Sequence, residues 1–125
     1  MSVEMVALRF VELCNQGRHF DVMRTMYAPE MVSVEGDGGE TVGKEPVIRK
    51  SEAFQGANAI LSQEIRGAFF CGDPKAPSGR FAVYTSIDFA PKAGGDRVTH
   101  QEVGLYTVRD DMITREEFFY VGRFL

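Results

Sequence analysis

Three β-rich runs fill the last third of the chain and constrain its fold more than any other feature. They span residues 80–89, 97–109 and 112–120, and turn-forming residues separate them. Acidic and hydrogen-bonding side chains stand among the aromatic residues of these runs: His100, Glu102, Glu116, Glu117 and Tyr120. Successive runs of this kind predict an antiparallel sheet. A curved sheet with polar groups among aromatics can form one wall of a small-molecule pocket.

The rest of the chain predicts helices ahead of the strands. Apolar residues recur at three- and four-residue steps in the first segment, and Ser2 precedes it as a candidate N-cap. The expected helices are 3–16, 19–27 and 43–54, the last ended by Gly56; the expected further strands are 31–35 and 58–71, with a bulge at Gly67. Residues 61–64 could equally be helical. The order predicts one α+β domain over residues 1–125, with helices packed on one face of an antiparallel sheet.

Composition excludes several classes of function. The net charge of −4 disfavours a nucleic-acid or anionic-membrane partner, because both require a basic surface. Two cysteines do not make a disulfide framework, and neither an apolar leader nor a run of membrane-spanning length is found. We therefore expect a cytoplasmic protein with reduced thiols. The two histidines lack metal-ligand spacing, so we expect no metal site and no cofactor.

The turn at Asp110-Asp111 suggests how the last two strands pair. As a two-residue hairpin loop it predicts Arg109 opposite Met112. Leu105 then lies opposite Glu116, and Val103 opposite Phe118. A slip of one residue, or one bulge, would reverse which side chains face inward. The expected inner face holds Phe81, Val83, Thr85, Ile87, Phe89, Val103, Leu105, Thr107, Thr114, Glu116, Phe118 and Tyr120; the outer face holds Tyr84, Ser86, Asp88, His100, Glu102, Gly104, Tyr106, Ile113, Arg115, Glu117 and Phe119.

Glu116 is the one acid among apolar neighbours in this register. Burial there would raise its pKa toward the range useful for acid/base chemistry. Pairing with an arginine, or a place at the open end of the sheet, is the alternative. Glu102 faces Arg115 or Arg97 in this register, whereas in the slipped register it enters the pocket beside His100.

These arguments give a set of candidate site residues. We predict Glu116 and Tyr120 as catalytic residues, and we expect His19 to lie at the surface. The predicted ligand-binding residues are Phe10, Tyr27, Phe54, Val83, Thr85, Gln101, Val103, Leu105 and Phe118. The outer face mixes charges with aromatics, which fits the interface of a homodimer.

Three segments carry a resemblance to a known family. They are residues 26–32 (MYAPEMV), 42–48 (VGKEPVI) and 104–113 (GLYTVRDDMI). Together with the order of elements, they resemble the SnoaL-like branch of the nuclear-transport-factor-2-like superfamily. The resemblance implies a cone of curved antiparallel sheet closed by the N-terminal helices, with a pocket inside and frequent dimerisation.

The resemblance also locates the family's functional positions in this sequence. SnoaL-like cyclases carry a His-Trp-Asp type of run on the last strand, where this chain has Glu116, Glu117 and Phe118. Phe118 thus stands at the acid position, and Glu116 precedes it by two residues. Gly104 stands where the penultimate strand often has an acid or histidine. Gly36, next to Glu35, matches the base of ketosteroid isomerases, and their first-helix tyrosine has no counterpart, since Phe10 is the aromatic residue there.

Two functions follow from the sequence. The first is cofactor-independent acid/base chemistry, of isomerase, cyclase or dehydratase type, on a small apolar carbonyl compound, with Tyr120 or Gln101 polarising an oxygen. The second is a non-catalytic module of the same fold that binds a small ligand or dimerises. A cavity beside Glu116 distinguishes the first from the second, in which Phe54, Phe81, Phe89 and Phe118 fill the cone.

Overall fold

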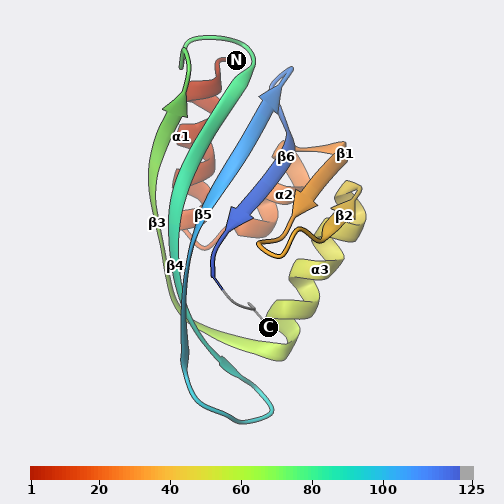
Figure 1. Ribbon diagram of the computed structural model, residues 1–125, viewed down its shortest axis with the longest axis vertical. Helices are drawn as coiled ribbons and strands as arrows, with labels where there is room; N and C mark the ends of the chain where they lie inside the picture. The colour runs from red at the N-terminus through yellow and green to blue at the C-terminus, as the bar shows by residue number, and fades with distance from the viewer. Residues whose placement is uncertain (122–125) are drawn as a thin grey trace.

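A curved six-stranded sheet forms one side of the molecule, and three helices cover its concave face (Figure 1). The structure is a computed structural model that describes residues 1–121. The elements are α1 (Val3–Asn15), α2 (His19–Met26), β1 (Tyr27–Val34), β2 (Glu40–Val42), α3 (Lys44–Ala57), β3 (Asn58–Cys71), β4 (Gly79–Pro91), β5 (Val98–Arg109) and β6 (Met112–Phe119). The α+β architecture expected from the sequence, with helices on the concave face of the sheet, is confirmed.

The helices form close to where the sequence predicts them. The Ser2 side chain accepts a hydrogen bond from the Met5 backbone N–H at 3.1 Å and so caps α1 as expected. Helix α3 differs at its end, because it continues through Gly56 to Ala57. The Asn58 side chain donates a hydrogen bond to the Phe54 carbonyl at 3.0 Å. This bond satisfies a carbonyl of the last turn, so Gly56 does not end the helix.

The strands lie in the order β2-β1-β6-β5-β4-β3. All neighbours are antiparallel except β1 and β6, which run parallel. The short strand β2 was not predicted. Strand β1 begins at Tyr27 rather than Met31, because the irregular pairing with β6 between Tyr27 and Val32 accommodates Pro29. The expected bulge at Gly67 is confirmed by the register shift between Gly67 and Phe69.

The β5–β6 hairpin corrects the predicted register. Arg109 does lie opposite Met112, and both turn residues, Asp110 and Asp111, have positive φ angles of 49° and 68°. The next inward pair is Val108 and Ile113. Thr107 then pairs with Arg115, so Thr114 is an extra residue on β6, a β-bulge.

The bulge changes which side chains of β5 face the helices. Leu105 lies opposite Glu117, and Val103 opposite Phe119, so the predicted pairs Leu105–Glu116 and Val103–Phe118 are wrong. On β5 the inward residues are His100, Glu102, Gly104, Tyr106 and Val108, while Gln101, Val103, Leu105 and Thr107 point outward. On β6 Glu116 and Phe118 point inward as expected, and Ile113 does too, against expectation. The predicted inner face of β4 is correct, since Phe81, Val83, Thr85, Ile87 and Phe89 are all buried.

The core forms where α1 packs over β3 and β4. Phe10 of α1 is fully buried and contacts two aromatic rings of the sheet. Its ring centroid lies 5.5 Å from that of Phe81 and 4.5 Å from that of Tyr106. Such edge and tilted contacts add to the gain from burying the rings. This aromatic cluster fixes the distance between α1 and the floor of the sheet.

We expect Phe10→Ala to lower the free energy of unfolding by about 3–5 kcal/mol, since it removes a fully buried ring. Leu8 is exposed on the same helix. Leu8→Ala should therefore change the free energy of unfolding by less than about 0.5 kcal/mol. Urea titrations followed by far-UV circular dichroism measure both values. Equal losses in the two variants would contradict the packing of α1 described above.

Candidate functional site

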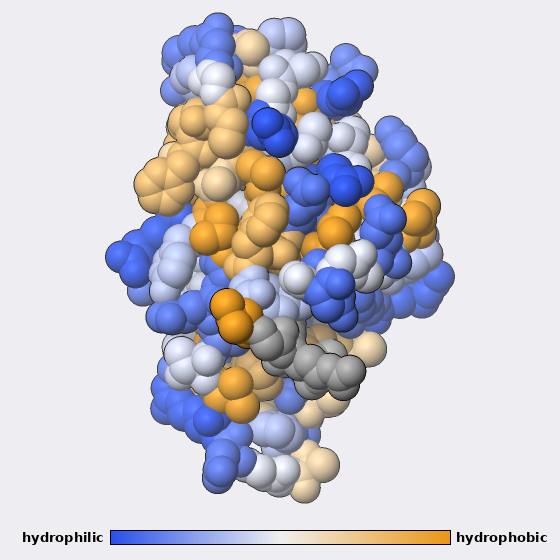
Figure 2. Space-filling view, viewed as in Figure 1, coloured by the Kyte–Doolittle hydropathy of each residue, from blue (hydrophilic) through white to orange (hydrophobic). Residues whose placement is uncertain are grey.

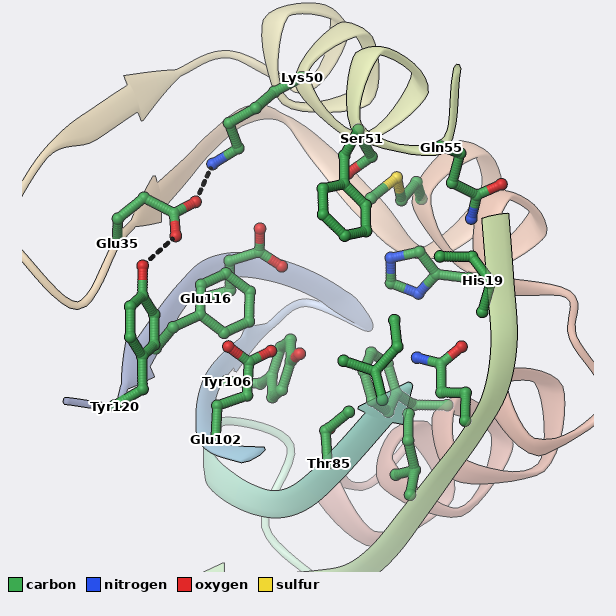
Figure 3. A pocket seen from close by; sticks show the side chains of 18 of the residues that line it. His19, Glu35, Lys50, Ser51, Gln55, Thr85, Glu102, Tyr106, Glu116 and Tyr120 are labelled. Carbon is green, nitrogen blue, oxygen red and sulfur yellow. Dashed lines mark hydrogen bonds and ion pairs between the residues drawn. The ribbon is translucent and has the colours of Figure 1, made fainter. Parts of the chain in front are cut away.

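A cavity of about 450 Å³ lies between the helices and the concave face of the sheet. Side chains from all three helices and from strands β3 to β6 line it, together with residues that follow β1 and β6. Its polar side gathers Glu35, Lys50, Glu102, Glu116 and Tyr120, whose side chains converge in Figure 3. Apolar side chains line much of the remainder: Phe10, Met23, Phe54, Ile60, Ile65, Ile87 and Phe118.

The predicted site residues fall into three groups. Six line the cavity, namely Glu116, Tyr120, Phe10, Phe54, Thr85 and Phe118. Two are buried without lining it, namely Tyr27 and Val83. Three lie on the outer face of the sheet, namely Gln101, Val103 and Leu105. The last group is a correction, because these side chains lie opposite the outward residues of β4 and point away from the helices, so Gln101 cannot polarise an oxygen in the cavity.

Glu116 is the most deeply buried acid of the cavity, with 3% of its surface exposed. The Tyr27 hydroxyl donates a hydrogen bond to Glu116 Oε1, and the Ser33 side chain is also hydrogen-bonded to this carboxyl group. Burial raises the pKa of Glu116, and these two hydrogen bonds together with the charge of Lys50 oppose the rise. None of the arginines in residues 1–121 forms an ion pair with Glu116, so the predicted alternative of an Arg–Glu116 pair does not hold.

Glu102 enters the cavity because it lies opposite Thr85 on the inner face of β4, as the slipped register predicted. Its Oε2 lies 3.1 Å from His100 Nε2, and little of either side chain is exposed. Burial raises the pKa of Glu102 to about 8, with further contributions from the charges of Glu35 and Glu116. Burial also lowers the pKa of His100. At neutral pH Glu102 is therefore mainly a protonated acid beside a neutral imidazole, and it can donate a hydrogen bond.

Glu35 and Lys50 belong to the same polar group, and neither was predicted as a site residue. Lys50 Nζ lies 2.6 Å from Glu35 Oε1, and the Tyr120 hydroxyl donates to Glu35 Oε2 at 3.0 Å (Figure 3). Burial raises the pKa of Tyr120 to about 12. The Tyr120 ring lies against Gly36, where an added Cβ would come within 2.9 Å of the ring. Glycine at position 36, which was compared with the base of ketosteroid isomerases, thus leaves space for the Tyr120 ring.

Strand and helix periodicity contained a signal for both missed residues. Glu35 continues the inward alternation of Met31 and Ser33 beyond β1. Lys50 lies three residues after Val47 and four before Phe54, on the face of α3 that covers the sheet.

His19 corrects another prediction, because it lines the cavity instead of lying at the surface. Its Nδ1 lies 3.7 Å from Cys14 Sγ. Burial lowers the pKa of His19 to about 4 and raises that of Cys14 to about 12. Both side chains are therefore neutral at physiological pH, and Cys14 lacks the thiolate that nucleophilic chemistry requires.

Neither a cluster of metal-ligating side chains nor a membrane-spanning helix is found in residues 1–121. No group of three or more His, Cys, Asp or Glu side chains in this range is placed to hold a metal ion. No helix in the same range combines the length and the apolar character that crossing a membrane requires.

Comparison with known proteins identifies the family. The family model for the SnoaL-like domain matches residues 1–120. The chain belongs to the SnoaL-like family. A solved structure from Mesorhizobium loti, a candidate SnoaL-like polyketide cyclase also described as a carbohydrate phosphatase, is 34% identical. The match covers 96% of this chain and 100% of that one, with a TM-score of 0.86.

More distant structures share the fold of this SnoaL-like protein. A ketosteroid isomerase-like protein from Erwinia carotovora atroseptica is 16% identical, with a TM-score of 0.71 over 98% of this chain and 95% of that one. An NTF2-like protein of unknown function from Burkholderia pseudomallei is also 16% identical, with a TM-score of 0.68 over 96% and 92% of the two chains. No curated protein matches the sequence significantly.

The acids of this SnoaL-like protein are displaced from the expected family positions but keep the same face. Glu116 precedes Phe118 by two residues on β6, and Glu102 precedes Gly104 by two residues on β5. Residues two apart on a strand share a face. Both carboxyl groups consequently reach the cavity, although the positions compared with the family's functional groups hold Phe118 and Gly104.

The raised pKa of Glu102 predicts how stability changes with pH. Between the ordinary glutamate pKa and about 8, the unfolded chain has released this proton while the folded protein keeps it. Glu102 therefore lowers the free energy of unfolding as pH rises through this window, by at most about 1.4 kcal/mol per pH unit. Glu102→Gln removes this titration. The free energy of unfolding of Glu102→Gln minus that of the wild type should therefore increase with pH up to about pH 8 and stay constant above it.

Urea denaturation at a series of pH values measures this difference. Glu52→Gln is the matched control, because Glu52 is exposed on α3 and does not line the cavity. Its stability should follow the pH dependence of the wild type. A Glu102→Gln curve parallel to that of the wild type at all pH values would show that Glu102 does not keep its proton in the folded state.

Proposed function

We propose that this SnoaL-like protein binds a small, largely apolar carbonyl compound in the cavity and catalyses proton transfer on it without a cofactor. Glu116 is the proposed acid/base, and Tyr120 is the second proposed catalytic residue. The observation that carries the proposal is the position of Glu116: a buried carboxyl group, its pKa raised by burial, that lines a cavity of about 450 Å³. Perturbed acids in apolar cavities are typical of such chemistry.

The two carboxyl groups suit complementary parts of the reaction. Glu116 takes a proton from the carbon next to the carbonyl group, the C–H electron pair forms a C=C bond, and charge moves to the carbonyl oxygen. Glu102, protonated at neutral pH, donates a hydrogen bond to that oxygen. Tyr120 turns its hydroxyl from Glu35 to a substrate oxygen. Return of the proton to the same or another carbon completes an isomerase-type reaction, and a cyclase or dehydratase type begins with the same abstraction.

The second candidate function is ligand binding without catalysis. It is favoured by the aromatic and aliphatic lining, in particular Phe10, Phe54 and Phe118. It is also favoured by the two hydrogen bonds that Glu116 already receives from Tyr27 and Ser33. In this case Glu116 has only a structural role, and a bound compound is released without chemical change.

Deuterium exchange distinguishes the two functions. In D₂O, an enzyme of the proposed kind exchanges protons next to the carbonyl group of small cyclic ketones, which proton NMR detects as loss of signal. Glu116→Gln should lower the exchange rate at least about 100-fold, the usual contribution of a general base. Glu52→Gln, at an exposed site on α3 outside the cavity lining, should keep the wild-type rate. Exchange that survives in Glu116→Gln, or ketones that bind without any exchange, would remove Glu116 from the mechanism.

We also propose that the protein forms a homodimer through the outer face of the sheet. Phe69, Val103 and Phe119 are exposed on this face, and Figure 2 shows apolar side chains gathered over the middle of the strands. Charges of both signs accompany them, including Arg115 and Glu117. A two-fold axis brings the same patch of each copy together. Acidic side chains of one copy can then pair with arginines of the other.

Light scattering after size-exclusion chromatography measures the molar mass. The wild type should have twice the chain mass of 13.9 kDa. Phe119→Lys places a charge in the proposed interface and should give a monomer with the same circular dichroism spectrum. Leu8→Lys, at an exposed site on α1, should remain dimeric. A monomeric wild type would rule the proposed dimer out.

A cytoplasmic location completes the proposal. Both cysteines are free, and Cys71 is exposed. An exposed free thiol suits a reducing compartment. A small apolar molecule is accordingly the ligand that we propose, with neither nucleic acid nor membrane as a partner.

A further inference from the structure

A chain of hydrogen bonds leads from α3 to the buried acid. Lys50 Nζ lies 3.1 Å from Ser33 Oγ as well as 2.6 Å from Glu35 Oε1. An ammonium group has only donors, so Ser33 Oγ accepts from Lys50. The Ser33 hydroxyl proton is then free to be donated onward. Its partner is Glu116, which lies directly opposite Ser33 across the parallel strands β1 and β6.

The direction of the bonds gives Glu116 two donors. Tyr27 donates from one end of β1, and Ser33 donates from the other. Ser33 is fully buried, so water does not compete for its hydroxyl group. Lys50 therefore acts on Glu116 in two ways, through its own charge and through the orientation that it imposes on Ser33. Two donors to a carboxylate favour its ionised form.

We propose that Lys50 and Ser33 are positioning residues that hold Glu116 in its ionised, proton-accepting form, while Glu102 keeps its proton. The inference rests on the proposed function for what Glu116 does with that proton. An ion pair with Glu35 alone does not explain the position of Lys50. The same ammonium group also contacts Ser33, which is fully buried.

The contrast between the two carboxyl groups supports this division. Burial raises the pKa of both. Hydrogen bonds from Tyr27 and Ser33 oppose that rise at Glu116, whereas at Glu102 the charge of Lys50 is the one opposing influence from residues 1–121. The ionisable groups that act on Glu116 come from four elements and the turn after β1: Cys14 on α1, Tyr27 on β1, Glu35 after β1, Lys50 on α3, and Glu102 and Tyr106 on β5. Lys50 is the one cation among them in the described chain.

Carbon-13 NMR of labelled glutamate side chains tests the inference without any substrate. The Glu116 carboxyl signal is assigned from its loss in Glu116→Gln, and its pH midpoint is then measured. Ser33→Ala and Lys50→Met should each move the midpoint upward by about one pH unit, the size expected for loss of a nearby opposite charge or a donor. The double variant should move it by less than the two shifts together, because both act on one path.

Two further variants separate this role from a general loosening of the cavity. Lys50→Arg keeps the charge and the donors and should restore most of the shift. Glu35→Gln breaks the same ion pair but removes a negative charge that raises the pKa of Glu116. It should therefore move the Glu116 midpoint downward, opposite to Lys50→Met. Shifts in the same direction for these two variants would overturn the proposal.

Lys44→Met is the matched control on the same helix. The Lys44 ammonium group donates to the Arg24 carbonyl at 2.5 Å, outside the cavity lining. Its loss should leave the Glu116 midpoint unchanged. If Ser33→Ala does not fold, the comparison of Lys50→Met with Lys50→Arg decides alone. An unchanged midpoint in Lys50→Met refutes the positioning role.

The exchange of ketone protons then links the titration to catalysis. Where the wild type exchanges a ketone, the pH–rate profile of Lys50→Met should move to higher pH together with the Glu116 midpoint. A midpoint that moves in a protein without exchange supports the positioning role and rejects the catalytic function. If exchange depends on Glu116 but the Glu116 titration midpoint is unchanged in Lys50→Met, the catalytic function is supported and the positioning role is rejected.

Discussion

A single extra residue in β6 determines what the cavity contains. Between the turn and the bulge, Val108 and Ile113 point toward the helices, and beyond Thr114 the inward pair is Tyr106 and Glu116. In a hairpin of uninterrupted register with Val108 inward, Arg115 and Glu117 would enter the cavity and Glu116 would face outward. The bulge is therefore the constraint that brings Glu116 onto the same side of the sheet as Glu102.

Burying several polar groups in an aromatic cavity is costly unless each has a partner. In residues 1–121 no buried side-chain nitrogen or oxygen lacks one. Glu116 achieves this with hydroxyl donors instead of an arginine, so its carboxyl group has partners without a fixed ion pair. Glu35 receives the ammonium group instead, together with Tyr120. The pairing of β1 with β6 makes this possible, because it places Ser33 opposite Glu116.

Local patterns were sufficient to predict the order of all elements except β2, the α1 cap and the inner face of β4. The helix and strand periods there are unbroken, and Ser2 and the Asp110-Asp111 turn have little structural freedom. The faces of β5 could not be predicted in the same way, since nothing in the sequence around Thr114 marks it as an extra residue. Lys50 was missed for another reason: a lysine on an amphipathic helix usually extends to solvent, whereas here Ser33 and Glu35 hold it toward the cavity.

The geometry of a β-strand explains how the displaced acids still reach the cavity. Functional positions were matched by their place along a strand, and at those places this chain carries Phe118 and Gly104. A carboxyl group two residues earlier reaches the same cavity, since the side-chain period of a strand is two. A displacement by two residues along a strand thus preserves the inner face, and the acid/base role proposed for Glu116 is compatible with its shifted position.

The charge balance of the polar side favours an uncharged ligand. Glu102 is mainly protonated at neutral pH, and Lys50 offsets the charge of Glu35. An anionic ligand would meet Glu116 at close range, and the two histidines, His19 and His100, have lowered pKa values and supply no compensating charge. A cationic ligand would compete with Lys50 for Glu35. The neutral carbonyl compound that we propose would avoid both costs and would accept a hydrogen bond from the protonated Glu102, which supports the proposal over an acid or an amine as the ligand.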